Sequence, residues 1–371
     1  MAGQVTVGRL AGIPVRVHWT LLAVGALLCM GLAEGVLPSA EPAVTTTVAW
    51  LAAGLTTIVF FGSILVHELA HALTARHFGV QTESIELWAL GGLARLRDEA
   101  PSPKADALTA GAGPLTSLLL GAGFIGAAYG AAALDTSDLL IGAIGWLGVV
   151  NVLLAVFNLL PGAPLDGGRL LRAWRWRRTG DRLRATDDAA RAGQFLAWVV
   201  IIVGGWGVLS GWGSLFLPLT GVFLLMAAKA EQVGVLAESR LEGVTVGDVT
   251  WFGVARASDD VDAETMLWQR DRLGAPRLVA VEDRQGAISG LVTEDQLLSI
   301  PESRRPLIRL SQLVVPMSRV VRAAPEEPLV AALRRTTPLS PWITVWGEGR
   351  LVGVVLPDAV RKQLQDRGLA V

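Results

Sequence analysis

The residues best suited to chemistry form a short polar motif inside an apolar segment. His67, Glu68 and His71 lie in the sequence HELAH, directly after the apolar residues 60–66. On a helix, His67 and His71 project from one face about 6 Å apart, so two ring nitrogens can bind one zinc ion. Glu68 beside them can move a proton on a water bound to the metal. Chance predicts only about 0.002 HExxH motifs in such a chain, and unpaired polar groups are costly in lipid, so a metal site is favoured over a structural role.

Two histidines leave a zinc ion short of a protein ligand, and two further residues are candidates. His77 has the offset of the third ligand of soluble metzincins, but those enzymes break the helix with a glycine where this sequence has Thr74. A continuous helix would point His77 away from His71, and its alternative role is that of a polar residue at the helix end. His18, at the edge of the first apolar segment, is interpreted as interfacial.

A carboxylate later in the chain is the stronger candidate. Asp166 lies in the sequence PGAPLDGG, in which Pro161 and Pro164 end a helix and the two glycines allow close backbone approach. Asp166 therefore stands at the end of its apolar segment, at the depth and on the side expected for the histidine pair. Asn158, eight residues earlier, either donates a hydrogen bond to an oxyanion or bonds between helices, and the sequence supports both roles equally.

Membrane-spanning helices must position these residues. The 371-residue chain is 52% hydrophobic with a formal charge of −1, which excludes an ordinary soluble enzyme, a disordered chain and a strongly basic nucleic-acid-binding protein. Cys29 is the single cysteine, so an internal disulfide framework and a Cys-rich zinc ribbon are excluded. Six segments are apolar enough to span a bilayer, although the last two are short and could form one re-entrant hairpin: 19–37, 47–75, 107–133, 139–160, 195–209 and 213–230.

The distribution of Lys and Arg predicts the orientation of these spans. The connecting residues 38–46, 134–138 and 210–213 contain neither residue type, whereas the predicted loop 169–191 on the opposite side contains eight arginines. Because basic residues concentrate in cytoplasmic loops, we expect a multi-pass protein of the cell membrane with a cytoplasmic N-terminus. An even number of spans then places the C-terminus in the cytoplasm as well.

The sequence of the second part of the chain predicts a soluble α/β region. Residues 1–230 contain 29 charged residues, whereas the remaining 141 contain 36, and residues 231–242 predict a charged helical connector. Strands are expected at 244–249 and 277–281, with a helix from Ser258 between them. The same order of elements is expected a second time, with a strand at 310–314, a helix at 328–335 and strands at 342–346 and 351–355. Gly290 and Gly353 occupy similar sequences 63 residues apart, which predicts an internal repeat.

Together, HExxH and the later sequence with Asn158, Pro161 and Asp166-Gly167-Gly168 resemble the paired signatures of site-2 proteases, which are intramembrane zinc metalloproteases. The sequences GIPVRVHW at 12–19 and AGAGP at 110–114 are weaker matches, and the resemblance covers about residues 5–230. It implies one Zn²⁺ per chain bound by His67, His71 and Asp166, with Glu68 as catalytic base. A hairpin at residues 84–97 either presents an edge to an unwound substrate strand or is purely structural.

The second part resembles a pair of cystathionine-β-synthase-type (CBS) modules, which are joined to some site-2 proteases and can bind adenine nucleotides. Modules that hold a ribose commonly place Asp three residues after a Thr or Ser, but here Gln296 follows Thr293 and Ala359 follows Leu356. A regulatory or dimerising role is therefore favoured over nucleotide sensing. The expected domains are a membrane-embedded metalloprotease at 1–230, a connector at 231–243 and a tandem CBS-type regulatory domain at 244–371.

These features predict a polytopic α-helical membrane protein of about six spans followed by an α/β CBS-type domain. The expected function is an intramembrane zinc endopeptidase that cleaves membrane-anchored proteins in regulated intramembrane proteolysis, and the resemblance implies single-span substrates such as anti-sigma factors. The expected partners also include the lipid bilayer and a second copy bound through the CBS modules, and exclude nucleic acid. The alternative is a CBS-gated transporter or channel with a metal site, which would not require Glu68 beside the histidines.

Overall fold

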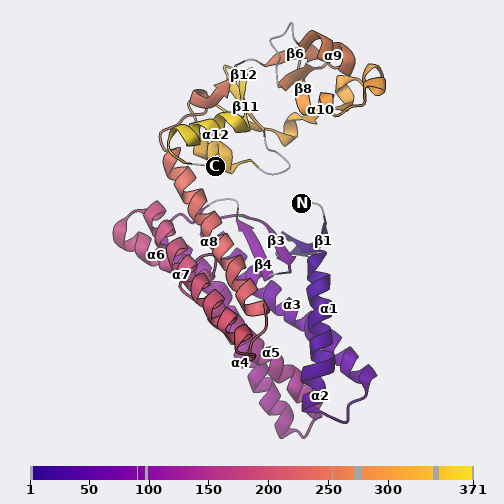
Figure 1. Ribbon diagram of the computed structural model, residues 1–371, viewed down its shortest axis with the longest axis vertical. Helices are drawn as coiled ribbons and strands as arrows, with labels where there is room; N and C mark the ends of the chain where they lie inside the picture. The colour runs from indigo at the N-terminus through magenta and orange to yellow at the C-terminus, as the bar shows by residue number, and fades with distance from the viewer. Residues whose placement is uncertain are drawn as a thin grey trace. The chain divides into compact units, whose positions relative to one another are not determined.

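The computed structural model describes residues 3–89, 91–96, 99–252, 254–270, 278–336 and 342–369 (Figure 1). The chain divides into two compact units, residues 1–235 and 236–371, which are described separately.

Among the described residues, six long apolar helices form most of the first unit, and each is long and apolar enough to cross a membrane. This number confirms the prediction of about six spans. The first span, Thr20–Ala40, consists of α1 (Thr20–Gly31), the π-helical turn η1 (Leu32–Val36) and α2 (Leu37–Ala40). The others are α3 (Thr46–His77), α4 (Pro103–Ala133), α5 (Asp138–Asn158), α7 (Arg182–Leu209) and α8 (Phe216–Arg240).

Small residues allow the helices around the predicted site to approach closely. A methyl group added to Gly121 of α4 would lie 2.7 Å from Val152 Cγ2 and 3.0 Å from the Gly148 carbonyl oxygen of α5. Helices that meet at glycine can bring their backbones together without an intervening side chain. This contact holds α5 against α4. The chain continues from the end of α5 to Asp166.

A four-stranded sheet lies at one end of the helical bundle (Figure 1). Its order is β1 (Gln4–Leu10), β2 (Ile13–His18), β3 (Thr82–Trp88) and β4 (Gly91–Leu96), and only β2 and β3 are parallel. Ile85 and Leu87 of β3 are buried with Ile64 and Ala72 of α3, so the sheet packs onto the helix that carries the histidines. The predicted hairpin at 84–97 is confirmed as β3 and β4; its residues Leu90 and Arg97 lie outside the described residues.

The arginine-rich segment 169–191 is helical, so its prediction as a loop was wrong. Helix α6 (Asp166–Thr179) ends at Gly180, whose φ of 71° suits glycine, and α7 begins at once with Asp181 as its N-cap. Alternation of Arg with Leu, Ala and Trp fits an amphipathic helix. The partly buried Arg169 and Arg172 pair with the carboxylate of Asp106. The polar first turns of α7 also explain why its apolar part looked short.

The second unit contains two sheets of the same topology, which confirms the predicted repeat. One sheet has the order β6 (Ala255–Ser258), β7 (Leu278–Glu282), β8 (Ile288–Thr293) and β9 (Val315–Pro316), and the other has β10 (Val321–Ala323), β11 (Ile343–Gly347), β12 (Arg350–Val355) and β5 (Thr250–Trp251). In each sheet the first pair is parallel and the other two are antiparallel. The helices are α9 (Ala263–Arg270), α10 (Glu294–Leu298), α11 (Leu329–Arg334) and α12 (Pro357–Asp366), with the short turns η2 (Gly247–Val249), η3 (Glu302–Leu307), η4 (Leu310–Gln312) and η5 (Met317–Arg319).

The strands expected at 244–249 and 310–314 are instead irregular segments that contain η2 and η4. In the first, the backbone N–H and hydroxyl of Thr245 donate to Asp248 Oδ2 at 2.8 and 2.9 Å and close a turn. Val244 and Val246 are nevertheless buried in the core. The alternating apolar residues of this segment are therefore buried around a turn and do not form a strand. Of the strand expected at 277–281, Arg277 lies outside the described residues, and β7 covers the rest.

Candidate metal centre

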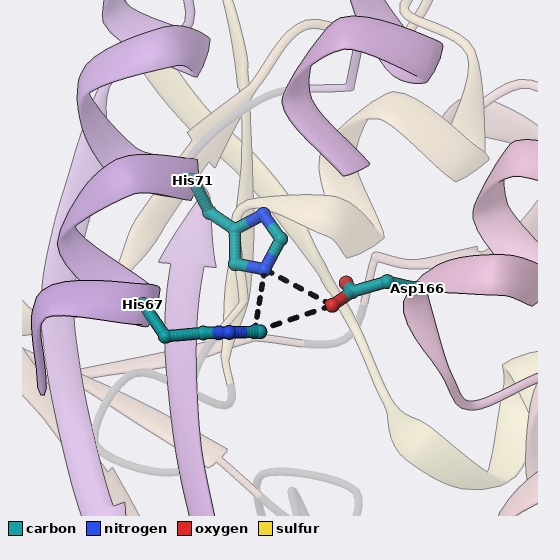
Figure 2. A group of neighbouring side chains, drawn as sticks. All are labelled: His67, His71 and Asp166. Carbon is teal, nitrogen blue, oxygen red and sulfur yellow. Dashed lines mark hydrogen bonds and ion pairs between the residues drawn. The ribbon is translucent and has the colours of Figure 1, made fainter. Parts of the chain in front are cut away.

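Helices α3 and α6 bring His67, His71 and Asp166 together, and their side chains converge on one point (Figure 2). The Nε2 atoms of His67 and His71 are 3.2 Å apart. Asp166 Oδ2 lies 3.3 Å from Nε2 of His67 and 3.2 Å from Nε2 of His71. Three atoms that can each bind a cation thus form a nearly equilateral triangle, supplied by residues 95 positions apart in the chain.

The size of this triangle fits zinc. An ion about 2.0–2.1 Å from tetrahedral nitrogen and oxygen ligands requires those ligand atoms to lie about 3.3–3.4 Å apart. The observed separations of 3.2–3.3 Å match that edge length. Two imidazoles and one carboxylate are also a known donor set of catalytic zinc, and they leave a fourth position open for water.

The second nitrogen of each imidazole is held by α4, which orients both rings. His71 Nδ1 lies 2.6 Å from the Thr109 carbonyl oxygen, and His67 Nδ1 lies 2.8 Å from Ser117 Oγ. Because a carbonyl oxygen can only accept, His71 donates from Nδ1 and keeps the lone pair on Nε2 for a metal. Both rings are buried, so these contacts also satisfy polar atoms that lipid could not.

Gly113 of α4 leaves the space in front of the two histidines open. A methyl group at this position would collide with His71 Nε2 and lie 2.5 Å from His67 Nε2. An ion shared by the two nitrogens would lie close to this point. Glycine at position 113 therefore keeps the space beside the two Nε2 atoms free of a side chain, and any other residue would fill it.

Asp166 is the first residue of α6, and the packing of that helix determines its position. Gly167 and Gly168 follow it, and a methyl group on Gly167 would collide with the Leu159 and Leu160 carbonyl oxygens. Burial alone would raise the pKa of the Asp166 carboxyl, but the nearby imidazoles of His67 and His71 hold that pKa well below its usual value. A lowered pKa favours the ionised carboxylate, which is the form that binds a metal ion.

Glu68 is buried beside the histidines and is held by the sheet. Its Oε2 accepts a hydrogen bond from the Ala94 backbone N–H at 3.1 Å. A methyl group on Gly92 would lie 2.7 Å from Glu68 Oε1, so the β4 backbone packs directly on this carboxylate. Glycine at position 92 is thus required for the close approach of strand and carboxylate.

A cavity of about 390 Å³ opens over these residues. Its wall combines the ligand triangle and Glu68 with apolar side chains from α5 and α8, including Leu154, Phe157, Phe223 and Leu224. Asn158 also lines this cavity, at the end of α5. Trp88 of β3 contacts Phe223 of α8 with ring centroids 6.0 Å apart, so the sheet and the last span meet at the cavity.

The structure separates the two remaining histidines from the triangle. His77 is exposed at the end of α3, where its ring contacts Phe78, and it is not part of the cluster. The helix continues through Thr74, which is why His77 cannot turn back. His18 Nδ1 lies 2.8 Å from Thr20 Oγ1, in the link between β2 and α1.

Sequence reasoning missed the groups that hold the site residues. The Thr109 carbonyl and the Ala94 N–H belong to the backbone, so residue type gives no sign of them. Gly113 belongs to the AGAGP motif, but that motif does not indicate a role for Gly113 beside the histidines. A run of small residues on the helix next to HExxH is the one signal that could have indicated a metal cavity there.

Comparisons with known proteins identify the family of the chain. The model for "Peptidase family M50" matches residues 55–133 and 122–200. The protein named "Putative zinc metalloprotease Rip3" from Mycobacterium tuberculosis is 39% identical over 375 residues, which cover all of this chain and 95% of that protein. The "Putative zinc metalloprotease sll0528" from Synechocystis is 28% identical and covers 98% of this chain and 96% of its own length.

Two solved structures resemble the two parts of the chain. The site-2 protease from Methanocaldococcus jannaschii is 28% identical and covers 62% of this chain and 95% of its own, with a TM-score of 0.44. The CBS domain of a membrane protein from Sphaerobacter thermophilus is 20% identical and covers 37% of this chain and 97% of its own, with a TM-score of 0.29. On the full-length similarity to the Mycobacterium protein, the chain belongs to peptidase family M50, the zinc metalloproteases of the site-2 type.

Proposed function

We propose that this protein is an intramembrane endopeptidase that hydrolyses a peptide bond of membrane-anchored substrate proteins, using one Zn²⁺ bound by His67, His71 and Asp166. The observation that carries the proposal is the triangle of ligand atoms, 3.2–3.3 Å on each edge, within a unit of six apolar helices. Membership of a metalloprotease family also favours this function over the transporter considered from the sequence, since transport does not require Glu68 beside the ligands.

The chain's own residues divide the chemistry between them. His67, His71 and Asp166 would hold the zinc ion, which, when bound, would lower the pKa of a water molecule to about 7 and so supply a nucleophile at neutral pH. Glu68 accepts the proton of the attacking water on its carboxylate. It then donates this proton to the amide nitrogen as the carbon–nitrogen bond breaks. The buried position of Glu68 keeps bulk water away from this transfer.

Asn158 is our candidate for stabilising the oxyanion that forms during attack. It lines the cavity together with Asp166 and Glu68. Its amide N–H groups could donate to the negative oxygen, a contribution that typically accelerates acyl transfer by about 10²–10³-fold.

The free edge of β4 is proposed as the place where the substrate binds. Among the described strands, β4 pairs only with β3, and the Ala94 N–H points away from β3 toward Glu68. Gly92 and Ala94 both line the cavity. A substrate helix must unwind before its peptide bond can be cleaved, and an extended strand added to β4 would satisfy the freed backbone groups while crossing the ligand triangle.

Single-span membrane proteins, including anti-sigma factors, are the proposed substrates, and the lysine and arginine distribution favours cytoplasmic termini. The second unit is proposed as a regulatory module that also supports dimerisation. Gln296 stands where a ribose-binding carboxylate would be expected, and its side chain accepts from the Thr293 N–H at 2.9 Å within a capping box. The first module therefore has an amide, and not a carboxylate, at this position.

Replacement of Glu68 by Gln tests the proposal. Wild-type and Glu68→Gln proteins are compared in vesicles with a reconstituted single-span substrate, and zinc is measured in both. We expect the variant to retain zinc and lose cleavage, because Gln keeps the shape of Glu68 but cannot accept the proton. Unchanged cleavage would show that Glu68 is not the base.

A further inference from the structure

Two arginines at the end of α6 lack an acidic partner in the part of the chain that the structure describes. Six of the eight arginines between residues 169 and 191 have a carboxylate oxygen within 3.4 Å. These pairs are Arg169 and Arg172 with Asp106, Arg175 with Asp188, Arg182 with Glu99, Arg184 with Asp181 and Arg191 with Asp187. Arg177 and Arg178 form no such pair, so this surface carries two uncompensated positive charges.

The two arginines share an exposed face with an aromatic ring. Trp174, Arg177 and Arg178 are spaced i, i+3 and i+4, which places them on one side of α6. All three residues are exposed, and the guanidinium carbon of Arg178 lies 4.6 Å from the centre of the Trp174 ring. The opposite side of the helix faces the protein, where Arg172 binds the buried Asp106.

The connections of α6 place it at a membrane surface. The link from α5 comprises only residues 159–165, and residues 180–181 separate α6 from α7. Since α5 and α7 are both long and apolar enough to cross the bilayer, a helix between their ends must lie where lipid headgroups are. Figure 1 shows α6 at the same end of the helical bundle as the sheet. Tryptophan is favoured at headgroup depth, and guanidinium groups bind phosphate through paired N–H donors.

We propose that Trp174, Arg177 and Arg178 form a binding surface for the headgroup of an anionic phospholipid in the adjacent leaflet. The guanidinium groups of Arg177 and Arg178 donate to the phosphate oxygens, and the Trp174 ring packs against the glycerol region. An anionic lipid is preferred over phosphatidylcholine because choline would offset the charge that the two arginines attract. The short connections to two spans make a lipid, rather than a soluble partner, the occupant of this surface.

The test uses the full-length protein reconstituted in vesicles of equal phosphatidylglycerol and phosphatidylcholine and then extracted in mild detergent. The ratio of the two lipids that remain bound is measured for wild type, R177Q/R178Q and the matched control R184Q/R191Q, which removes the same charge from arginines that have partners. We expect the phosphatidylglycerol enrichment to fall roughly tenfold in R177Q/R178Q and to stay near wild type in the control. Zinc content reports whether each variant is folded.

Two results would overturn the proposal. Unchanged enrichment in R177Q/R178Q would show that this surface binds no anionic lipid. An equal loss in R184Q/R191Q would show that only the total charge matters. If the double variant does not fold, Arg177→Gln alone, which leaves the contact between Arg178 and Trp174, must still lower the enrichment about threefold.

Discussion

Arg172 of α6 donates two hydrogen bonds of 2.8 Å, from Nε and Nη2, to the carboxylate of Asp106 on α4. Asp106 is 1% exposed, so the pair is almost fully withdrawn from water. It joins the helix that begins at Asp166 to the helix that holds the histidine rings. We interpret this ion pair as the contact that fixes the third ligand relative to the first two.

Asp106→Asn should therefore lower both stability and zinc affinity. Removing one partner of a buried ion pair costs about 3–5 kcal/mol. Here Arg172 would keep only its longer contact with Glu231, at 3.8 Å, and Arg169 would lose its contact with Asp106. Denaturant titration in detergent and zinc competition with a chelator measure the two effects. Asp188→Asn is the control: its pair with Arg175 is more than a third exposed, and its loss should cost less than about 1 kcal/mol. Equal losses in the two variants would contradict the role given to Asp106.

Gly113→Ala should abolish zinc binding while leaving the protein folded. The added methyl group would occupy the position of an ion shared by His67 and His71. Gly111→Ala, on the same helix, is the matched control, because its methyl group would meet nothing nearer than Leu170 Cδ2 at 4.0 Å. Zinc content after purification distinguishes the variants. Full zinc in Gly113→Ala would mean that the ion lies elsewhere.

Ser117→Ala should weaken zinc binding without removing it. Loss of the 2.8 Å contact frees the His67 ring to rotate, and loss of such a supporting contact typically lowers metal affinity about 10–100-fold. Thr116→Val removes a hydroxyl that bonds only to its own helix, and it should leave affinity unchanged. A chelator competition assay that gives the same affinity for Ser117→Ala and wild type would argue against this orienting role.

Gly92→Ala should separate zinc binding from catalysis. The methyl group would press on Glu68 and displace its carboxylate, whereas the three ligands are untouched. We expect normal zinc content and cleavage of a reconstituted substrate reduced by about 10²-fold or more, as expected for loss of a positioned base. Gly8→Ala, in β1 of the same sheet, meets nothing within 4 Å and serves as control. Normal cleavage by Gly92→Ala would contradict the position assigned to Glu68.

Adenine nucleotides should not bind the second unit tightly. Gln296 uses its side chain in the capping box of α10, and at the equivalent point of the second repeat α12 begins with Leu356 and Pro357, without a side-chain cap. Isothermal titration of the full-length protein with ATP should show no heat of specific binding. A saturable site of micromolar affinity would restore nucleotide sensing as the role of this unit.

The predictable and unpredictable parts of the site differ in physical origin. His67, His71 and Asp166 stood out because lipid penalises polar side chains, so their presence in apolar segments indicated a function. Their orientation depends on the Thr109 carbonyl, on the Ala94 N–H and on an absent side chain at Gly113. Backbone groups and empty space have no signature in residue type, and only the folded structure reveals them.

The same contrast applies to the fold. Long apolar segments predicted six helices because length and hydropathy suffice to identify a span. The prediction of a strand at 244–249 was wrong, because valines at alternating positions occur in buried turns as well as in strands. Hydrogen bonds from Thr245 to Asp248 stabilise the turn that the structure contains. Likewise, the ion pairs of Arg169 and Arg172 with Asp106 of α4 are visible only in the folded structure.

The coordination of the metal tests the central claim most directly. X-ray absorption at the zinc edge on the purified full-length protein should show two imidazoles and two oxygens at about 2.0–2.1 Å, one oxygen from Asp166 and one from water. The spectrum of His77→Ala should be identical, whereas Asp166→Ala should lose zinc or one oxygen ligand. A third imidazole in wild type, lost in His77→Ala, would contradict the His67, His71 and Asp166 site.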